Sequence, residues 1–285
     1  MEPFRRTAGA SVSRLAANRH AWTEDDLGAP FQPSPGVLVI TASKARDLAA
    51  CPRRYGLAHV LRLEADPDAA EQTEELTLGL SLHRELRLRH SPMAGHDDEG
   101  FLDPTSPQSA WLSQRVLAHR ALCPSTVHRD EVEYVDGECD LQWFRARRNV
   151  IVRGRIDALW LHHDGTLEVR DYKSGHVAES IENDPAALFY GLLALTHPLA
   201  RSRIKVTRVR VSYEALRSAG SFVVSLDFDE ATIRRAIAFV QEIDETIRGE
   251  RRFSATPSPW ACGTCPYQFT CPFSASHNRG LPGGD

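Results

Sequence analysis

Apolar residues recur along this chain with two periods, and the period separates the predicted helices from the predicted strands. Steps of three and four residues put apolar side chains on one face of a helix. Residues 233–247 show this spacing most clearly, and Gly249 follows them as a typical helix end. A first helix is predicted from a cap at Thr41 or Ser43 until just after Cys51, where Pro52 ends it. Further helices are predicted over residues 55–63, 76–88, 111–122 and 185–195.

Alternation of apolar and polar residues predicts strands in the second half of the chain. Residues 207–213 alternate in this way, and residues 222–228 are their expected partner. Two further β-rich runs, 150–161 and 167–173, are separated by HHDGT, which is typical of a hairpin turn. Helices, a central sheet, more helix and strand, and a cysteine-rich end together indicate an α/β fold.

Two stretches interrupt these elements. Residues 1–36 are mixed polar and end in a Pro- and Gly-containing run, so we expect a flexible tail and linker. Residues 91–109 are rich in Pro, Gly and Asp and are expected to form a flexible excursion. The remaining residues, 37–285, are expected to form a single domain that includes the cysteines between 262 and 271.

The composition excludes some classes of protein. A net charge of −4 gives no global nucleic-acid signature, although 34 Lys+Arg residues leave room for a local basic surface. No apolar run has the length of a membrane span, and the N-terminus lacks the apolar core of a secretory signal. We therefore expect a cytoplasmic protein with no membrane partner. In that compartment, the six cysteines indicate metal binding or buried thiols and not a disulfide framework.

The most informative stretch is RGRIDALWLHHDGTLEVRDYKSG, residues 153–175. Asp171 and Lys173 share one strand face by period-two geometry. Whether Asp157 joins them depends on the turn. A two-residue loop pairs Asp157 with Tyr172 and puts the two aspartates on opposite faces. A three-residue loop, with Gly165 left-handed, pairs Asp157 with Asp171 instead.

In the second register the two carboxylates would lie about 5 Å apart at their Cβ atoms and would call for a shared cation. Oxygen ligands of this kind suit Mg²⁺ or Mn²⁺. A neighbouring ammonium can orient or help to deprotonate an attacking water, or stabilise developing negative charge. These groups are what metal-dependent phosphodiester hydrolysis needs. The residues alone leave open that Asp157, Asp171 and Lys173 are solvated surface residues with chance spacing.

Five motifs in the same order resemble the PD-(D/E)XK nucleases, in particular their RecB-like branch. GRID at 154–157 and DYKSG at 171–175 resemble the core motifs, and residues 79–83 match the G-x-x-x-H element. Residues 41–55 resemble the opening helix that ends in C-P-x-R, and C-x2-C-x5-C at the C-terminal end matches an iron–sulfur subgroup. That subgroup contains the CRISPR-associated RecB-type exonucleases and the nuclease domain of AddB. The resemblance implies a restriction-endonuclease-like core, a central mixed sheet flanked by helices.

The resemblance also implies roles for particular residues. His83, Asp157 and Asp171 would bind the divalent metal with the carbonyl of Tyr172, and Lys173 would be the catalytic lysine. One departure concerns the helix after the sheet, where the family usually has Q-x-x-x-Y. Here Tyr190 is present but Ala186 stands at the glutamine position, which puts substrate engagement in doubt more than the chemistry.

Three of the six cysteines, Cys262, Cys265 and Cys271, lie within ten positions of one another. The resemblance supplies Cys51 as the fourth ligand of a [4Fe–4S] cluster that would staple the C-terminal segment to the N-terminal helix. Four thiolates also suit Zn²⁺, which stays the alternative. Cys123, at the end of a predicted helix, and Cys139, beside a predicted turn, are interpreted as ordinary thiols.

Two functions from different classes follow. The first is a metal-dependent DNA exonuclease that acts on single strands or ends, in DNA repair, recombination or antiviral defence, with a possible helicase or defence-complex partner. Arginines near the motifs could contact the DNA backbone and Tyr190 could stack on a base; the arginines are Arg53, Arg54, Arg153 and Arg155. The second is a non-catalytic nucleic-acid-binding or assembly subunit that keeps the fold and the cluster.

Overall fold

The computed structural model describes residues 36–66, 72–90, 107–128, 131–175, 177–202, 205–217, 220–249 and 252–275. The chain divides into two compact units. Of the described residues, those from 36 to 49 and from 72 to 249 belong to the larger unit, and 50–66 and 252–275 belong to the smaller one. The predicted tail lies outside the described residues except for Gly36, and so does most of the predicted excursion, up to residue 106. The single domain over 37–285 stays a prediction.

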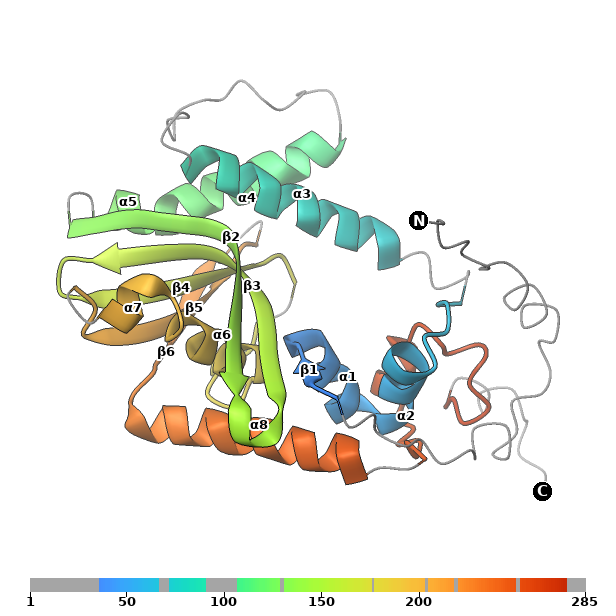
Figure 1. Cartoon of the computed structure of the whole chain (residues 1–285). Helices are drawn as coiled ribbons and strands as arrows, with labels where there is room; N and C mark the ends of the chain where they lie inside the picture. The colour runs from blue at the N-terminus through green and yellow to red at the C-terminus, as the bar shows by residue number, and fades with distance from the viewer. Residues whose placement is uncertain are drawn as a thin grey trace, which may run out of the picture. The chain divides into compact units, whose positions relative to one another are not determined.

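The larger unit is built on a six-stranded mixed sheet with the order β1-β3-β4-β5-β6, in which β2 also pairs with β3 (Figure 1). Pairing is parallel for β1–β3 and β4–β5 and antiparallel for β2–β3, β3–β4 and β5–β6. The strands are β1 Leu38–Ile40, β2 Val132–Arg145, β3 Val150–His162, β4 Thr166–Lys173, β5 Arg208–Ala215 and β6 Phe222–Asp227.

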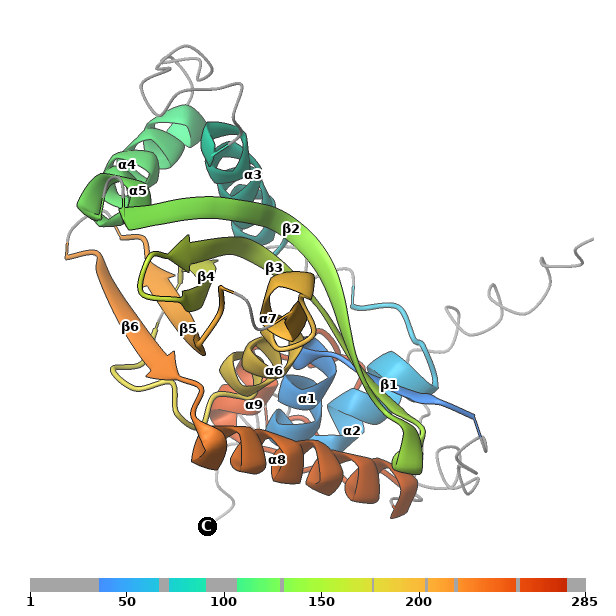
Figure 2. The ribbon, with the colours of Figure 1, turned by 60° about the vertical axis from the view of Figure 1, so that its left-hand side comes forward.

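Helices of the larger unit cover both faces of this sheet (Figures 1 and 2). One face carries α3 and α4, and the other carries α6 and α8. The helices are α1 Ala42–Ala50, α3 Gln72–His90, α4 Pro107–Leu122, α5 Pro124–Val127, α6 Pro185–Ala194, α7 Pro198–Ser202 and α8 Glu230–Gly249. The larger unit is therefore an α/β fold with a mixed central sheet flanked by helices. No helix of the described part of the chain is long and apolar enough to span a membrane.

Apolar side chains fill the space between the sheet and the helices on each face. On the α3 side, a buried cluster joins Leu82 and Leu86 of α3 to Trp160 of β3 and Tyr172 of β4. On the other side, α6 is buried along almost its whole length because nearly all of its residues are apolar. The Asp184 carboxylate caps its first turn by accepting from the Ala186 and Ala187 amides. The amphipathic α8 then covers α6 with one face.

The predicted helices are present, with shifted ends. Thr41 caps α1 through a hydrogen bond from the Lys44 amide to its hydroxyl, 3.3 Å. The second predicted helix ends at Val60 and consists of α2 Pro52–Tyr55 and a π-helical turn Gly56–Val60. The helix predicted from residue 111 begins at Pro107, where proline is tolerated in the first turn.

The sequence analysis missed β2 and β1. Charged residues interrupt the apolar positions of β2 and its pairing with β3 shifts between Tyr134 and Asp136, so the period of two is broken. Its side chains are all half-buried or exposed. Cys139, predicted beside a turn, lies within β2 and pairs with Ile156; that prediction was wrong for the same reason.

In the smaller unit, the segment after Cys51 is tied to the C-terminal segment by hydrogen bonds. The buried carboxylate of Asp66 accepts from the Phe269 amide at 2.8 Å, and the Asp66 amide donates to the Pro266 carbonyl at 2.8 Å. The Tyr267 hydroxyl donates to the Leu63 carbonyl at 3.0 Å. These hydrogen bonds join parts of the chain about two hundred residues apart, and they do so through protein groups alone.

Candidate active site and cysteine pocket

The β3–β4 hairpin has the three-residue register. Ala158 pairs with Arg170 and Leu161 with Leu167, so His162 and Thr166 close the turn. Gly165 has a φ of +83° and donates its amide to the His162 carbonyl at 2.9 Å. An added Cβ at Gly165 would stand 2.9 Å from the Lys205 carbonyl oxygen, so glycine is required there.

This register sets Asp157 opposite Asp171, one step beyond the last paired residues. Beyond the last backbone pair of β3 and β4, the Asp157 side chain bonds to β4 instead: its Oδ2 accepts from the Tyr172 amide at 2.9 Å. On the edge of β3 that faces β4, the described strands leave residues 153–157 without a neighbour, since β1 pairs only as far as Val152. Asp157 therefore lies where the sheet opens.

His83 reaches this opening from α3. Its Nδ1 lies 3.2 Å from Asp157 Oδ1, and its Nε2 lies 3.0 Å from the Tyr172 carbonyl oxygen. Burial acts to lower the pKa of His83, but the hydrogen bond and charge of Asp157, with the charges of Asp171 and Glu138, raise it above its usual value. His83, Asp157 and the Tyr172 carbonyl thus come together, and their role as metal ligands with Asp171 stays a prediction.

Asp171 and Lys173 form an ion pair of 2.5 Å on β4. Asp171 is 3% exposed, and burial together with the charge of Asp157 raises its pKa to about 6 against the opposing effect of the Lys173 ammonium. The Lys173 ammonium lies 4.8 Å above the Tyr213 ring and is partly open to solvent. The strand thus sets a buried carboxylate beside a lysine that solvent can reach.

Tyr190 of α6 also contacts this site. A hydrogen bond joins its side chain to Asp171, and the charge of Asp171 and burial raise the pKa of the Tyr190 hydroxyl well above its usual value. Ala186, one turn earlier, is buried in the first turn of α6. Gly154 lies under the same helix, because a Cβ there would meet Leu193 Cδ1 at 2.7 Å. The glycine of GRID is therefore explained by the packing of α6.

Glu138 is a candidate ligand that the sequence analysis did not find. It lies on β2 between Gly137, which pairs with Ala158, and Cys139, so it stands across from Asp157. Donor atoms of His83, Glu138 and Asp157 lie within 4.8 Å of one another, a spacing that could hold a metal ion. Because the sequence analysis missed β2, it had no signal that placed Glu138 here.

The four predicted DNA-contacting arginines lie in two places. Arg153 and Arg155 are exposed on β3, and Arg155 pairs with Glu138 and Asp140 at 3.3 Å each. Arg53 and Arg54 line the cysteine pocket of the smaller unit. Arg53 is 5% exposed, with its guanidinium 4.4 Å from the centre of the Phe273 ring. Contact of any of these arginines with DNA stays a prediction.

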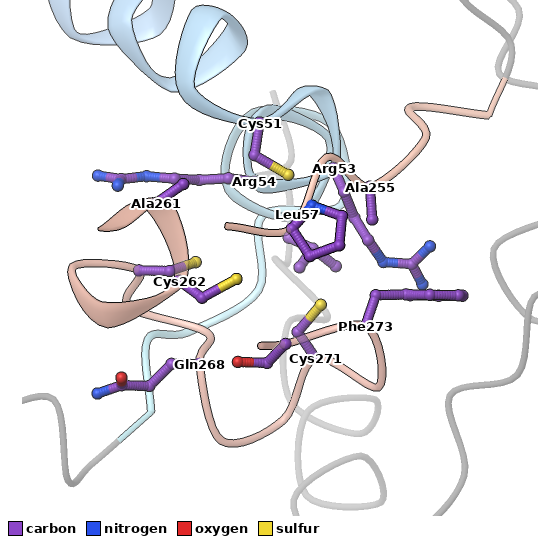
Figure 3. A pocket seen from close by; sticks show the side chains of 13 residues that line it. Cys51, Arg53, Arg54, Leu57, Ala255, Ala261, Cys262, Gln268, Cys271 and Phe273 are labelled. Carbon is purple, nitrogen blue, oxygen red and sulfur yellow. The ribbon is translucent and has the colours of Figure 1, made fainter. Parts of the chain in front are cut away.

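The cysteine pocket is lined by Cys51, Cys262, Cys265 and Cys271. Figure 3 shows the sulfur atoms of Cys51, Cys262 and Cys271 directed toward a common space. Burial raises the pKa of Cys265 and of Cys271, and the negative charges of the other thiols raise both further. Such an assembly of soft donors suits a metal or a cluster that takes thiolates.

A mixed α/β sheet that brings two carboxylates, a histidine and a lysine together is typical of nucleases that use divalent metals. The chain belongs to the PD-(D/E)XK nuclease superfamily, whose family model matches residues 39–272. Membership implies a nucleic-acid substrate and phosphodiester hydrolysis, which in this superfamily typically uses a divalent metal.

Solved structures give distant likenesses. The structure of SSO0001 is 18% identical with a TM-score of 0.36, and the alignment covers 82% of this chain and 85% of that one. A structure from Eubacterium rectale named "Putative exonuclease" is 8% identical with a TM-score of 0.43, over 98% and 97% of the two chains. No curated protein matches the sequence. The family assignment therefore rests on the family model.

Proposed function

We propose that this chain is a metal-dependent deoxyribonuclease that removes nucleotides from single-stranded DNA or DNA ends. The observation that supports this proposal most directly is the placement of Asp157, Asp171 and Lys173 on neighbouring strands at the opening of the sheet. A pair of solvated surface aspartates would not include one that is 3% exposed with a raised pKa.

Asp157, Asp171, His83 and the Tyr172 carbonyl would hold Mg²⁺ or Mn²⁺, with Glu138 as a further carboxylate. The fit is chemical: the imidazole of His83 and the carboxylates of Glu138 and Asp157 lie within 4.8 Å of one another. Asp171 faces Asp157 across the strand pair and adds a further negative charge that a cation would offset. When bound, the cation would neutralise charge that develops on the scissile phosphate.

The chain's own residues would do the remaining work. Lys173 lies beside Asp171 and is partly open to solvent, so its ammonium could orient an attacking water or stabilise negative charge on a phosphate oxygen. Tyr190 donates to Asp171 and would hold that carboxylate in place. The Tyr172 amide does the same for Asp157.

We further propose that the cysteine pocket holds a [4Fe–4S] cluster with a structural role. No three of the four sulfur atoms, all of them in described residues, lie within 4.8 Å of one another. A single Zn²⁺ would require sulfurs about 3.8 Å apart, whereas a cluster accepts a wider spacing. The charges of Arg53 and Arg54 oppose, without reversing, the rise in the pKa of Cys271 and Cys265 that burial causes.

An anaerobic digestion with Mn²⁺ or Mg²⁺ tests the substrate class. Three DNAs would be compared: linear single-stranded and linear blunt duplex, both 5′-labelled, and circular single-stranded with an internal label. We expect rapid loss of the linear single strand and no cutting of the circle. Cutting of the circle would show that the activity is endonucleolytic, because a circle has no end from which an exonuclease could start. No cutting of any DNA would favour the assembly subunit, which the buried Ala186 at the usual glutamine position supports.

A helicase or defence-complex partner, and a role in repair, recombination or defence, stay predictions. A chain with a net charge of −4 has no strong overall attraction for DNA, so a partner that delivers the strand would help.

A further inference from the structure

A second group of metal-ligating side chains lies in the larger unit, outside the candidate active site. His90 is the last residue of α3, His119 lies in the last turn of α4, and Cys123 follows α4. Their exposures are 7%, 1% and 0% respectively. The Cys123 amide donates to the His119 carbonyl at 2.7 Å, so these two side chains are one helical turn apart.

The donor atoms have the spacing of ligands around one small cation. The Nε2 atoms of His90 and His119 are 3.0 Å apart, and Cys123 Sγ is 3.5 Å from His90 Nε2. All three donor atoms lie within 4.8 Å of one another. Tetrahedral Zn²⁺ with two imidazoles and one thiolate would require about 3.3 Å between the nitrogens and about 3.5 Å from nitrogen to sulfur.

The surroundings orient one of these ligands. Glu214, with 0% exposure, lies 2.7 Å from His119 Nδ1, which directs the Nε2 of that ring toward the other two side chains. Arg170 in turn pairs with Glu214 at 2.9 Å. A carboxylate behind a histidine is the usual support of a zinc ligand, because it fixes the ring and raises its basicity.

The charges around the group favour a cation. Two buried carboxylates, Glu168 and Glu214, share the buried guanidinium of Arg170, and Glu168 also contacts His162 at 2.8 Å. Zn²⁺ bound to one thiolate would bring a single net positive charge close to the buried carboxylate of Glu214.

Two further polar atoms next to the group are buried and have no hydrogen-bond partner among the described residues. They are the hydroxyl of Tyr172 and Nε1 of Trp160. The Tyr172 ring lies 5.3 Å from the His119 ring and the Trp160 ring lies 4.9 Å from the His90 ring. Buried polar groups are normally satisfied, so these two atoms call for a partner that the described side chains do not supply.

We propose that His90, His119 and Cys123 form a zinc site, with Glu214 as the carboxylate that orients His119. The site would join the end of α3 to the end of α4 and would fix the helix that also carries His83. Its existence does not depend on the proposed nuclease activity.

Metal analysis of the purified full-length protein tests this proposal. We expect about one zinc per chain, with an X-ray absorption spectrum that shows two nitrogen ligands and one sulfur ligand. Cys123→Ser should lose the zinc, and Cys139→Ser should keep it, because Cys139 lies on β2 outside the group. Cys271→Ser should also keep it, which distinguishes this site from zinc in the cysteine pocket.

If Cys123→Ser does not fold, the zinc spectrum of the wild type decides. A sulfur-only spectrum would overturn the proposal, and so would zinc that disappears with Cys271→Ser. Folded zinc-free protein that takes up no Zn²⁺ on titration would overturn it as well. In that case protonated His119 paired with Glu214 accounts for the group.

Discussion

Opposing electrostatic effects act on the pKa of Asp171 in the candidate active site. Burial and Asp157 favour its protonated form, and Lys173 and His83 favour the carboxylate. A pKa of about 6 means that without metal the group changes charge close to neutral pH. A bound divalent cation would keep Asp171 ionised, because the cation binds only the carboxylate form.

The metal should therefore stabilise the protein more at higher pH. Because its folded-state pKa is raised, Asp171 without metal contributes stability fully below its ordinary value of 3.8, and loses it as pH rises through about 6. Mn²⁺ requires an ionised Asp171 and a neutral His83, and the pKa of His83 is raised above its usual value. The affinity should therefore rise with pH through about 6 and go on rising until His83 has lost its proton. The measurement is the Mn²⁺-induced rise in Tm between pH 5 and pH 8. Asp171→Asn should abolish the rise; a rise that does not change with pH in the wild type would contradict the account.

Glu138 should contribute to metal affinity. It stands across from Asp157, within reach of the ion that His83 and Asp157 could hold. Glu138→Gln keeps the shape of the side chain and removes its charge, so we expect Mn²⁺ affinity by calorimetry to fall by about tenfold or more. Glu133→Gln, on an exposed position of the same strand, is the control. Equal Mn²⁺ affinities in the two variants would show that Glu138 does not contribute to metal binding.

At this scale the sequence predicted the candidate site residues that belong to motifs and gave no signal for those that do not. Asp157, Asp171, Lys173 and His83 were found because the order of their motifs resembles a family, and their roles stay predictions. Glu138, His90, His119 and Cys123 carry no motif. Their proximity arises when α3, α4 and β2 pack on the same sheet, which no local pattern reports.

At the scale of elements, the β3–β4 hairpin sets the relative positions of Asp157 and Asp171 in the candidate active site. A slip of one residue would move Asp157 to the face opposite Asp171. The alternation of apolar residues left two registers open, and Gly165 decides between them with its positive φ. The turn sequence HHDGT permitted this outcome but did not require it.

Gly165→Ala should destabilise the larger unit. The substitution forces a side chain into a left-handed conformation and against the Lys205 carbonyl oxygen. We expect the free energy of unfolding to fall by about 1–3 kcal/mol. Denaturant unfolding would measure the change, with Gly249→Ala as the control, because a Cβ there has no atom within 4 Å. Similar losses in both variants would contradict the role of Gly165.

Helices were predicted better than strands because their caps and prolines are local signals. Thr41 and Pro52 bound α1, and Gly249 ends α8, as the sequence indicated. β2 is instead defined by its pairing with β3, and its charged residues conceal the alternation. Partner strands that lie far apart in the sequence are the part of the fold that local patterns cannot supply.

At the scale of the whole molecule, the sequence predicted an α/β nuclease fold and an N-terminal cysteine that joins three C-terminal ones. The structure brings all four cysteines to one pocket in the smaller unit. The hydrogen bonds of Asp66 and Tyr267 that support this pocket were not predicted, because they involve backbone groups that any residue carries.

Loss of one pocket cysteine should remove the cluster and destabilise the smaller unit. We expect anaerobically purified wild type to be brown with visible charge-transfer absorption, and Cys271→Ser to be colourless with a lower Tm. Cys139→Ser should keep both colour and Tm. Colourless wild-type protein that contains zinc in the pocket would contradict the cluster.

The most direct test of the central claim is the rate at which Lys173→Ala digests 5′-labelled single-stranded DNA with Mn²⁺, compared with wild type and Lys205→Ala. Lys205 is an exposed lysine of the same unit and controls for lost positive charge. We predict a fall of at least about a hundredfold for Lys173→Ala, with Tm and Mn²⁺ affinity retained, and no change for Lys205→Ala. Digestion by Lys173→Ala at the wild-type rate would contradict the assignment of this site.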